Sequence, residues 1–520
     1  MCTSSEELSK LSEVFNSRNL KFQPDFRNVD PSKHYRYCSV LGMEEQEHFY
    51  RSQENTEKEL VLSQKWRPLN EDGTPNLCYL SNKSRIENFL KEYKREGFDL
   101  LESTILDILN DDSRISEKFE TLPGLRKFWK LTPDEEKENV LEKFANVFRI
   151  SLRAEELLPE RIYRIVDDVI SATFSQEQCA ALLSWMFFYS KRNRSFIGIL
   201  TSIHPISIEK IKFLLHYFDE ISKEMPQGNV SFMRIKNENF MEMDFEKSKN
   251  QPISKDVSIF DDLLIEQTAL CSQVDFANKH IGGGVLRLGG VQEEIRFLMC
   301  PEMIVSMLLF DRMEPDEAIS IVGAQVFSSY SGYSGKLKWK ILEPLDALSN
   351  NLLYRDEFGR LQTEALAINA IKFFGRQSKN LGQQLEENNI KKELIKCGVA
   401  FCAQNRGSDY GSFDKIPIVS GWWGCGAYNG NKPLKFLIQL MAASIAGRPL
   451  QFCTFGDTVM GNKCRQMKRR LEMDNFTIGQ LYKLLLEIPK MEIYDEMHVF
   501  DSLEEICART VKIGEFEIIF

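Results

Sequence analysis

Residues 274–297, with the sequence VDFANKHIGGGVLRLGGVQEEIRF, contain a short apolar segment, a glycine loop and the start of a helix. Gly282, Gly283 and Gly284 lack Cβ atoms, so the backbone N–H groups of this loop can come close to a ligand. The helix that follows adds the positive end of its dipole, which favours an anion at the same place. Glu293 and Glu294 stand in its first turn. The stretch therefore predicts a strand, an anion-binding loop and a helix that opens on two carboxylates.

The size and composition of the chain are those of a globular protein. It has 520 residues, of which 43% are hydrophobic and 27% charged, enough for two or three domains. The longest nearly apolar run, residues 436–446, falls short of the roughly 20 residues that a membrane-spanning helix requires. The first residues, MCTSSEE, lack the basic and apolar regions of a signal peptide. We expect a soluble protein of the nucleus or the cytoplasm, without membrane partners.

The cysteines and the charge exclude other classes of protein. Twelve cysteines are present without a CxxC pair, so we expect reduced thiols and no zinc site. The net charge of −10 argues against a broad basic face, and we expect no direct sequence-specific binding of nucleic acid. An anionic ligand must therefore be captured by a local, shaped site.

The pattern along the chain divides it into four regions. Residues 1–75 are polar and predict a partly irregular N-terminal tail. Residues 76–225 are rich in helical patterns and predict an all-helical accessory domain. Residues 226–495 alternate strand and helix patterns and predict an α/β domain, and residues 496–520 form a C-terminal extension.

Individual elements can be predicted in both domains. Two capping boxes, TPDE at residues 132–135 and SQEQ at residues 175–178, predict helix starts in the helical region. In the α/β region we expect strands at residues 229–235, 273–276, 318–327, 337–342, 365–371, 416–420 and 450–455, and helices at residues 292–309, 383–403, 433–446, 459–474 and 478–488. Ligands of such sheets bind at the carboxyl ends of strands, and the glycine loop occupies one of these ends.

The glycine loop does not match the common phosphate-binding motifs. Arg287 stands where the dinucleotide fingerprint has its third glycine, and the segment GYSGKL at residues 332–337 lacks the Ser or Thr of a P-loop. Glycines before a helix also serve tight turns, and glutamates in a first turn also serve as partners of the helix dipole. The residues of the loop alone leave these interpretations open.

A second glycine loop, SGWWGCGAYNG at residues 420–430, again leaves a strand and leads into a helix. Two such loops could wrap a diphosphate from both sides. Tyr333 and Phe455 stand at turns after predicted strands, where an aromatic ring can stack on a base or serve ordinary packing. Adjacent glutamates on a helix point about 100° apart, so Glu293 and Glu294 cannot flank one glycosidic bond from opposite faces.

Several motifs together resemble a known family. QVDFAN at residues 273–278, GGG at residues 282–284 and, seven residues later, QEEIRF at residues 292–297 are similar to the signature of poly(ADP-ribose) glycohydrolases. The motifs YSGY, WGCGA and TFGD follow in the order of that family, beginning at Tyr330, Trp423 and Thr454. The resemblance covers about residues 80–490.

This resemblance implies a fold and an activity. The fold is a macrodomain-like three-layer α/β/α sandwich with a mixed sheet, preceded by a helical accessory domain. The activity is hydrolysis of the ribose–ribose O-glycosidic bonds of poly(ADP-ribose), mainly exo-acting, which releases ADP-ribose. No cofactor and no metal are expected. The implied partners are the polymer and ADP-ribosylated proteins as substrate, and the protein is expected to act as a monomer.

The resemblance also assigns residues to roles. Glu294 is the implied general acid/base, and Glu293 holds the ribose hydroxyls with help from Asn278. The diphosphate is held by Gly283, Gly284, Gly424, Cys425, Gly426, Ala427 and Tyr428, and the adenine is enclosed by Tyr333 and Phe455, with Gln292, Ile265 and Glu266 nearby. A helix dipole favours an ionised glutamate, so burial, the adjacent carboxylate and a bound phosphate must favour the proton that a general acid needs.

One position departs from the family pattern. Trp422 stands where the family usually has asparagine, which replaces an amide by a bulky indole. We expect activity to survive because both glutamates are present. Two alternatives remain at this point: a catalytically weak reader that binds ADP-ribose, and a hydrolase of single ADP-ribosyl units on proteins.

Overall fold

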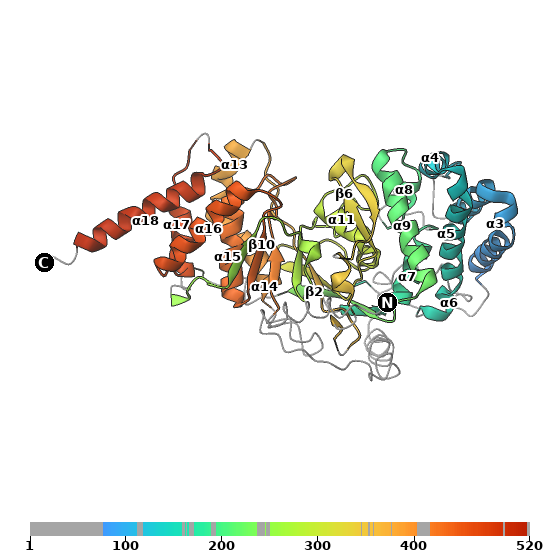
Figure 1. Cartoon of the computed structure of the whole chain (residues 1–520), viewed down its shortest axis with the longest axis horizontal. Coiled ribbons are helices and arrows are strands. Elements are labelled where there is room, and N and C mark those ends of the chain that lie inside the picture. The colour runs from blue at the N-terminus through green and yellow to red at the C-terminus, as the bar shows by residue number, and fades with distance from the viewer. Residues whose placement is uncertain are drawn as a thin grey trace.

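The structure is a computed structural model that describes residues 76–516 except 112–117, 159–161, 163, 166–170, 189–193, 237–244, 246–249, 345, 352–353, 357, 376, 403–415 and 492–493. The predicted N-terminal tail, residues 1–75, lies outside the described residues. The described chain runs from helices at one end of the molecule, through a central sheet, to helices at the other end (Figure 1).

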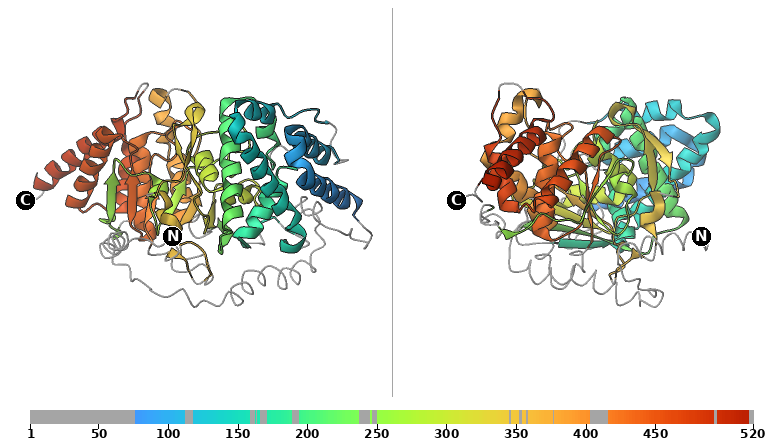
Figure 2. Two further views of the ribbon diagram at one scale, coloured as in Figure 1. Left: turned by 45° about the vertical axis from the view of Figure 1, so that its right-hand side comes forward. Right: turned by 60° about the vertical axis from the view of Figure 1, so that its left-hand side comes forward.

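The first part of the described chain is helical, as predicted. Its helices are α3 (Leu77–Asn110), α4 (Pro123–Leu131), α5 (Asp134–Leu152), α6 (Ala154–Leu157), α7 (Gln176–Trp185), α8 (Ile197–Leu200) and α9 (Pro205–Lys223). In α9, Ile208, Ile211 and Leu215 recur at helical spacing and are buried. Figure 2 shows this bundle beside the sheet from two further directions.

The two predicted capping boxes have different outcomes. At the start of α7, the hydroxyl of Ser175 accepts a hydrogen bond from the N–H of Gln178 at 3.1 Å, and the Gln178 side chain accepts one from the N–H of Ser175 at 2.9 Å. That prediction is confirmed. The box at residues 132–135 is wrong, because Thr132 ends α4 and donates its hydroxyl to the carbonyl of Phe128 at 3.0 Å. Pro133 then precedes α5 without a side-chain cap.

The central sheet is mixed and has eight strands in the order β1-β2-β5-β8-β4-β9-β10-β3. The strands are β1 (Ser171–Ser175), β2 (Asn229–Lys236), β3 (Val257–Phe260), β4 (Ser272–Asp275), β5 (Glu317–Val322), β8 (Glu364–Ala367), β9 (Ile418–Ser420) and β10 (Leu450–Cys453). β4 is parallel to β8 and β9, and β10 is parallel to β9 and β3. β1, β2, β5 and β8 pair antiparallel in that order. β1 lies in the region predicted to be all-helical, yet it completes one edge of the sheet.

The two faces of the sheet contact different hydrophobic cores. In β5, Ile319 and Ile321 belong to the core shared with the helical bundle, whereas Ala318 and Val322 belong to the opposite core. The first core includes α9 and α11 (Gln292–Met299), and the second includes α14 (Glu387–Phe401), α15 (Lys432–Ala446), α16 (Thr458–Met473) and α17 (Ile478–Glu487). The predicted three-layer α/β/α sandwich with a helical domain is confirmed.

Two predicted elements are shorter than expected. The helix predicted at residues 292–309 is interrupted, because α11 ends at Met299 and Pro301 begins the 3₁₀ helix η5 (Pro301–Val305), followed by α12 (Ser306–Leu309). The strand predicted at residues 318–327 ends where Gly323, with φ +97°, turns the chain. β6 (Ser328–Ser331) and β7 (Lys338–Ile341) then form a separate two-stranded ribbon.

Further helical segments lie between and after these elements. They are η4 (Ile265–Gln267), η6 (Ser334–Lys336), η7 (Asp346–Asn350), α13 (Gln377–Gln384) and α18 (His498–Phe516). α18 lies in the predicted C-terminal extension, and its Val499, Phe500 and Leu503 are buried in the second core. No helix among the described residues has both the length and the apolar character needed to cross a membrane.

Candidate active site

A cavity of about 500 Å³ opens at the carboxyl edge of the parallel strands. Its walls come from the segments that follow β4, β8, β9 and β10, from the start of α11, and from the end of β6 and the turn after it. The residues that line it are Glu266, Phe276, Ala277, Asn278, Val291, Gln292, Glu293, Glu294, Ile295, Tyr330, Tyr333, Ala370, Trp422, Trp423, Gly424, Gly426, Ala427, Tyr428 and Phe455. This volume is in the range of pockets that hold a nucleotide-sized ligand.

The glycine loop passes directly against the two glutamates. A Cβ atom at Gly283 would lie 2.5 Å from Oε2 of Glu293 and 2.6 Å from Oε1 of Glu294, so both carboxyl groups converge on this one position. Gly283 has φ +49°, and Gly282 before it has φ +83°, conformations that L side chains rarely adopt. A Cβ atom at Gly289 would lie 2.5 Å from the same oxygen of Glu294. The glycines therefore serve the approach of backbone to carboxylate.

Glu293 is buried and bonded to backbone on both sides. Its Oε1 accepts a hydrogen bond from the N–H of Gly282 at 2.7 Å, and its Oε2 accepts one from the N–H of Asn278 at 2.9 Å. Burial raises the pKa of Glu293 well above its ordinary value, and the nearby carboxyl groups of Asp275 and Glu294 raise it further. Glu293 thus ties the end of β4 to the glycine loop.

Glu294 lines the cavity and closes the other end of the loop. Its Oε1 accepts a hydrogen bond from the N–H of Gly284 at 2.8 Å, and its Oε2 accepts one from the N–H of Val291, the residue before α11, at 2.9 Å. Only 6% of the residue surface is exposed. The side chain is therefore held in one direction by two backbone donors, at the wall of the cavity.

Asp275 is a third carboxyl group that the sequence interpretation did not assign. It lies at the end of β4 and is 1% exposed, and neither of its side-chain oxygens has a hydrogen-bond partner among the described residues. Burial raises its pKa to about 8, Glu294 acts in the same direction and Arg296 opposes it. The available signal was an acidic residue inside the apolar run QVDFA, because a charged side chain is rarely fully buried unless it is paired.

Aromatic side chains form a further part of the cavity wall. Tyr333 is 55% exposed, and its hydroxyl accepts a hydrogen bond from the N–H of Gln292 at 3.2 Å. Phe455 is 40% exposed and has φ +53°. Glu266 accepts a hydrogen bond from the hydroxyl of Tyr330 at 2.7 Å, and both line the cavity. Tyr330 was quoted in a motif but not assigned to the site.

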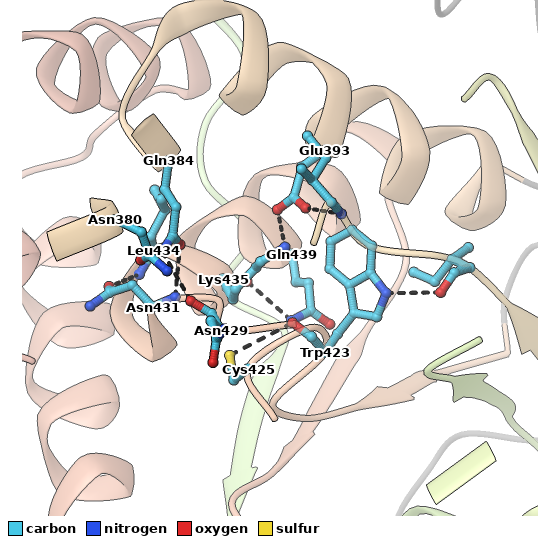
Figure 3. Close-up of polar contacts among 12 residues, drawn as sticks. Asn380, Gln384, Glu393, Trp423, Cys425, Asn429, Asn431, Leu434, Lys435 and Gln439 are labelled. Carbon is cyan, nitrogen blue, oxygen red and sulfur yellow. Dashed lines mark hydrogen bonds and ion pairs between the residues drawn. The ribbon is translucent and has the colours of Figure 1, made fainter. Parts of the chain in front are cut away.

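The second glycine loop rests on a buried polar network (Figure 3). Lys435 of α15 forms an ion pair with Glu393 of α14, and its Nζ lies 4.1 Å from the centre of the Trp423 ring. The indole N–H of Trp423 donates to the carbonyl of Ile368 at 2.9 Å. Gly424 has φ +74°, and a Cβ atom there would meet the Nζ of Lys435 at 3.1 Å. This network fixes the loop that forms one wall of the cavity.

One group of side chains among the described residues could bring ligand atoms together for a metal. His216, Asp219 and Glu220 place one ligand atom each within 4.8 Å of one another on α9. Lys143 and Lys223 approach Asp219 at 3.6 and 3.0 Å, so its charge is already balanced. None of the three lines the cavity, so they give no metal to the candidate site.

Comparison with known proteins decides the family. The family described as poly(ADP-ribose) glycohydrolase (PARG), macro domain fold, matches residues 243–462, and that described as poly(ADP-ribose) glycohydrolase (PARG), helical domain, matches residues 131–234. Poly(ADP-ribose) glycohydrolase 2 of Caenorhabditis elegans is 44% identical over 96% of this chain and 98% of the relative. The chain belongs to the poly(ADP-ribose) glycohydrolase family. It is therefore a glycosidase, and it hydrolyses poly(ADP-ribose).

This chain covers different shares of the length of two further glycohydrolases. Poly(ADP-ribose) glycohydrolase 1 of Caenorhabditis elegans is 44% identical over 96% of this chain, which spans only 63% of that relative. Poly(ADP-ribose) glycohydrolase 1 of Arabidopsis thaliana is 29% identical over 62% of this chain and 71% of the relative. The family resemblance seen in the sequence is thus confirmed.

Most residues that the glycohydrolase resemblance assigned lie together. Glu293, Glu294, Asn278, Gln292, Glu266, Tyr333, Gly424, Gly426, Ala427, Tyr428 and Phe455 line the cavity, whereas Gly283, Gly284, Ile265 and Cys425 do not. Gly283 and Gly284 lie behind the carboxyl groups, and Ile265 packs in a small core. Cys425 points its Sγ at the carbonyl of Trp423, and burial raises its pKa to about 12.

Trp422, the departure from the glycohydrolase pattern, is part of the cavity wall. Its indole N–H donates to the carbonyl of Thr454 at 2.9 Å, and its ring packs edge-on against Phe452. Lys432 lies over the same ring, with Nζ 5.4 Å from its centre. The indole donor is used to hold the end of β10, so the ring offers the cavity a surface and not a polar group.

Proposed function

We propose that the chain releases single ADP-ribose units from the end of poly(ADP-ribose), with Glu294 as general acid and base. The observation that carries this proposal is the convergence of the Glu293 and Glu294 carboxyl groups at Gly283, within 2.6 Å of one position, beside a cavity that aromatic rings also line. A cavity of about 500 Å³ suits one nucleotide-sized unit, which favours attack at a chain end.

The wall residues suggest how ADP-ribose lies in the cavity. Tyr333 and Phe455 present exposed rings between which an adenine can stack, and Glu266 adds an acceptor beside them. The backbone of Gly424, Gly426 and Ala427 offers N–H groups to the diphosphate. At the other end, Glu293 and Asn278 face the second ribose, and the hydroxyl of Tyr428 lies 3.1 Å from the side-chain nitrogen of Asn278.

In the proposed reaction, Glu294 gives a proton to the departing ribose oxygen as the glycosidic bond breaks. The sugar passes through an oxocarbenium-like state, whose positive charge Glu293 and the diphosphate stabilise. Glu294 then takes a proton from the water that attacks the sugar carbon, which restores its starting state.

Two buried carboxyl groups lie near Glu294. Burial raises the pKa of Glu293 well above its ordinary value and that of Asp275 to about 8. A bound diphosphate adds negative charge nearby, which favours the protonated form of a carboxyl group.

The products of polymer cleavage test the proposal. The purified chain should convert poly(ADP-ribose) to ADP-ribose as the main product on ion-exchange chromatography, with few oligomers. Mainly oligomers would contradict exo action. Binding of ADP-ribose in calorimetry without any product would support the reader, and release from mono-modified protein but not from polymer would support the hydrolase of single units.

Further properties are proposed with the same activity. ADP-ribosylated proteins are the carriers of the polymer, and the enzyme acts as a monomer in the nucleus or the cytoplasm, without direct nucleic-acid binding. The domain limits at residues 76–225, 226–495 and 496–520 also remain predictions. Light scattering coupled to size exclusion should give one chain mass, close to 60.3 kDa; twice that mass contradicts the monomer.

A further inference from the structure

Lys210 is a buried cation that contacts the glycine loop from the helical domain. It stands in the second turn of α9, and the residue has no exposed surface. Its Nζ donates hydrogen bonds to three carbonyl oxygens of the loop, those of Gly284, Val285 and Arg287, at 2.9, 2.8 and 2.7 Å. An ammonium group has three N–H donors, so every donor of Lys210 is used on this one segment.

The same segment holds Glu294 from its other side. The N–H of Gly284 donates to Oε1 of Glu294 at 2.8 Å, and the N–H of Gly289 donates to the carbonyl of Gly284 at 3.0 Å. Lys210 and Glu294 are thus both hydrogen-bonded to Gly284, Lys210 to its carbonyl and Glu294 to its N–H. The direction of the Glu294 carboxyl group depends on where the backbone at Gly284 is held.

Other residues of the helical domain pack against the same loop. A Cβ atom at Gly198 of α8 would lie 2.6 Å from the carbonyl oxygen of Leu286, and one at Gly290 would lie 2.3 Å from Cδ1 of Ile206 in α9. The backbone is therefore in close contact with α8 and α9 over residues 284–290, while its other side faces the carboxylates. Helix α9 lies between the bundle and α11 (Figure 1).

Burying a cation only for packing is energetically unfavourable at this position. Burial lowers the pKa of Lys210 to about 7, and the negative charge of Glu294 is the opposing influence. A methionine or leucine would fill the space without desolvating a charge. What only the ammonium group provides is the fixed orientation of three carbonyl groups.

We propose that Lys210 is a positioning residue for Glu294, through which the helical domain sets the geometry of the catalytic loop. It does not touch substrate; it fixes the backbone of residues 284–287, and this backbone holds the Glu294 carboxyl group at the wall of the cavity. The inference rests on the proposed role of Glu294. It gives the helical domain a defined part in catalysis.

The structure offers a matched control for the loss of a buried lysine. Lys396 of α14 is also buried, and its Nζ donates to the carbonyls of Glu314 and Glu317 at 2.5 and 2.7 Å. Burial lowers its pKa to about 8. Neither carbonyl belongs to a residue of the cavity wall. Lys396→Met therefore removes a similar buried cation without disturbing the glycine loop.

The test compares Lys210→Met with Lys396→Met in ADP-ribose release, ADP-ribose binding and thermal unfolding. We expect Lys210→Met to lower kcat by about 10- to 100-fold, because a misplaced catalytic group costs that much, while the Kd of ADP-ribose in calorimetry stays near the wild-type value. Lys396→Met should lose thermal stability and keep the wild-type kcat. A folded Lys210→Met variant with wild-type kcat, or an equal loss of kcat in both variants, overturns the proposal.

A second variant tests the proposal if Lys210→Met does not fold. Lys210→Gln keeps a polar head that can donate to two of the three carbonyls, and its kcat should fall between those of Lys210→Met and the wild type, with unchanged Kd. A folded glutamine variant with wild-type kcat is also a contradiction. If the wild type itself releases no ADP-ribose, the proposed function fails; if it does and the Lys210 variants match it, only the role of Lys210 fails.

Discussion

Oε1 of Glu294 lies 2.8 Å from the amide nitrogen of Gly284, so the proposed catalytic acid is hydrogen-bonded to the glycine loop that faces it. Its second oxygen is bonded to the N–H of Val291 at the other end of the loop. The loop and the carboxyl group therefore form one rigid unit. A change that moves the loop should also misdirect Glu294, even where no residue of the cavity wall is altered.

Gly283→Ala should abolish most of the activity. The new methyl group would lie within 2.6 Å of both glutamate carboxyl groups, on a backbone with φ +49°. We expect ADP-ribose release to fall by about 100-fold or more, as for a displaced catalytic group. Gly447→Ala is the control, because Gly447 also has positive φ, +63°, but a Cβ atom there meets nothing within 4 Å. That control should destabilise the fold by about 1 kcal/mol and keep full activity; equal activity of the two variants refutes the explanation.

Removal of the aromatic rings should weaken ligand binding. Stacking of a base on an aromatic ring contributes about 1–3 kcal/mol, so Phe455→Ala and Tyr333→Ala should each raise the Kd of ADP-ribose in calorimetry by about 5- to 150-fold. Leu131→Ala, at an exposed position of α4, is the control and should leave Kd unchanged. If both aromatic variants bind ADP-ribose like the wild type, the adenine lies elsewhere.

Asp275→Asn should change the dependence of stability on pH. Burial raises the folded-state pKa of Asp275 to about 8, from 3.8, with Glu293, Glu294 and Arg296 around it. A raised carboxyl pKa means that the folded state holds a proton that the unfolded state has lost, so wild-type stability falls as the pH rises from about 4 to about 8. An asparagine has no such proton to lose.

The measurement is the unfolding temperature of Asp275→Asn relative to wild type at pH 5 and pH 8. The unfolding temperature of the variant minus that of the wild type should be higher at pH 8 than at pH 5 by about 2 °C or more. Asp107→Asn, at an exposed position of α3, removes the same charge and should show no such gain. A constant difference at both pH values would mean that Asp275 is ionised in the folded protein.

The fold could be predicted where local pattern and tertiary contacts agree. Apolar runs at residues 229–235 and 450–455 became the buried strands β2 and β10, and the apolar run after Pro433 became α15. β1 and β3 were missed because SATFS and VSIF are short and gain their structure from pairing with β2 and β10. The helix at residues 292–309 was predicted too long because Pro301 interrupts it.

From the sequence, only those residues of the candidate site that belong to recognisable motifs could be predicted. Glu293, Glu294, Tyr333 and Phe455 follow from the family resemblance, and the structure brings them to one cavity. Lys210 carries no sequence signal, because a lysine in an amphipathic helix is ordinarily exposed. Its burial depends on contact between α9 and a loop more than 70 residues later, which no local pattern reports.

Glu294 is the proposed acid and base of polymer hydrolysis. Glu294→Gln keeps the size of the side chain, so its side-chain oxygen can still accept one of the two hydrogen bonds, but it cannot exchange a proton. The decisive measurement is the amount of ADP-ribose released from poly(ADP-ribose) by equal amounts of wild type and Glu294→Gln, both shown by calorimetry to bind ADP-ribose. We predict release by the wild type and almost none by the variant. Equal release from both would show that Glu294 is not the acid and base.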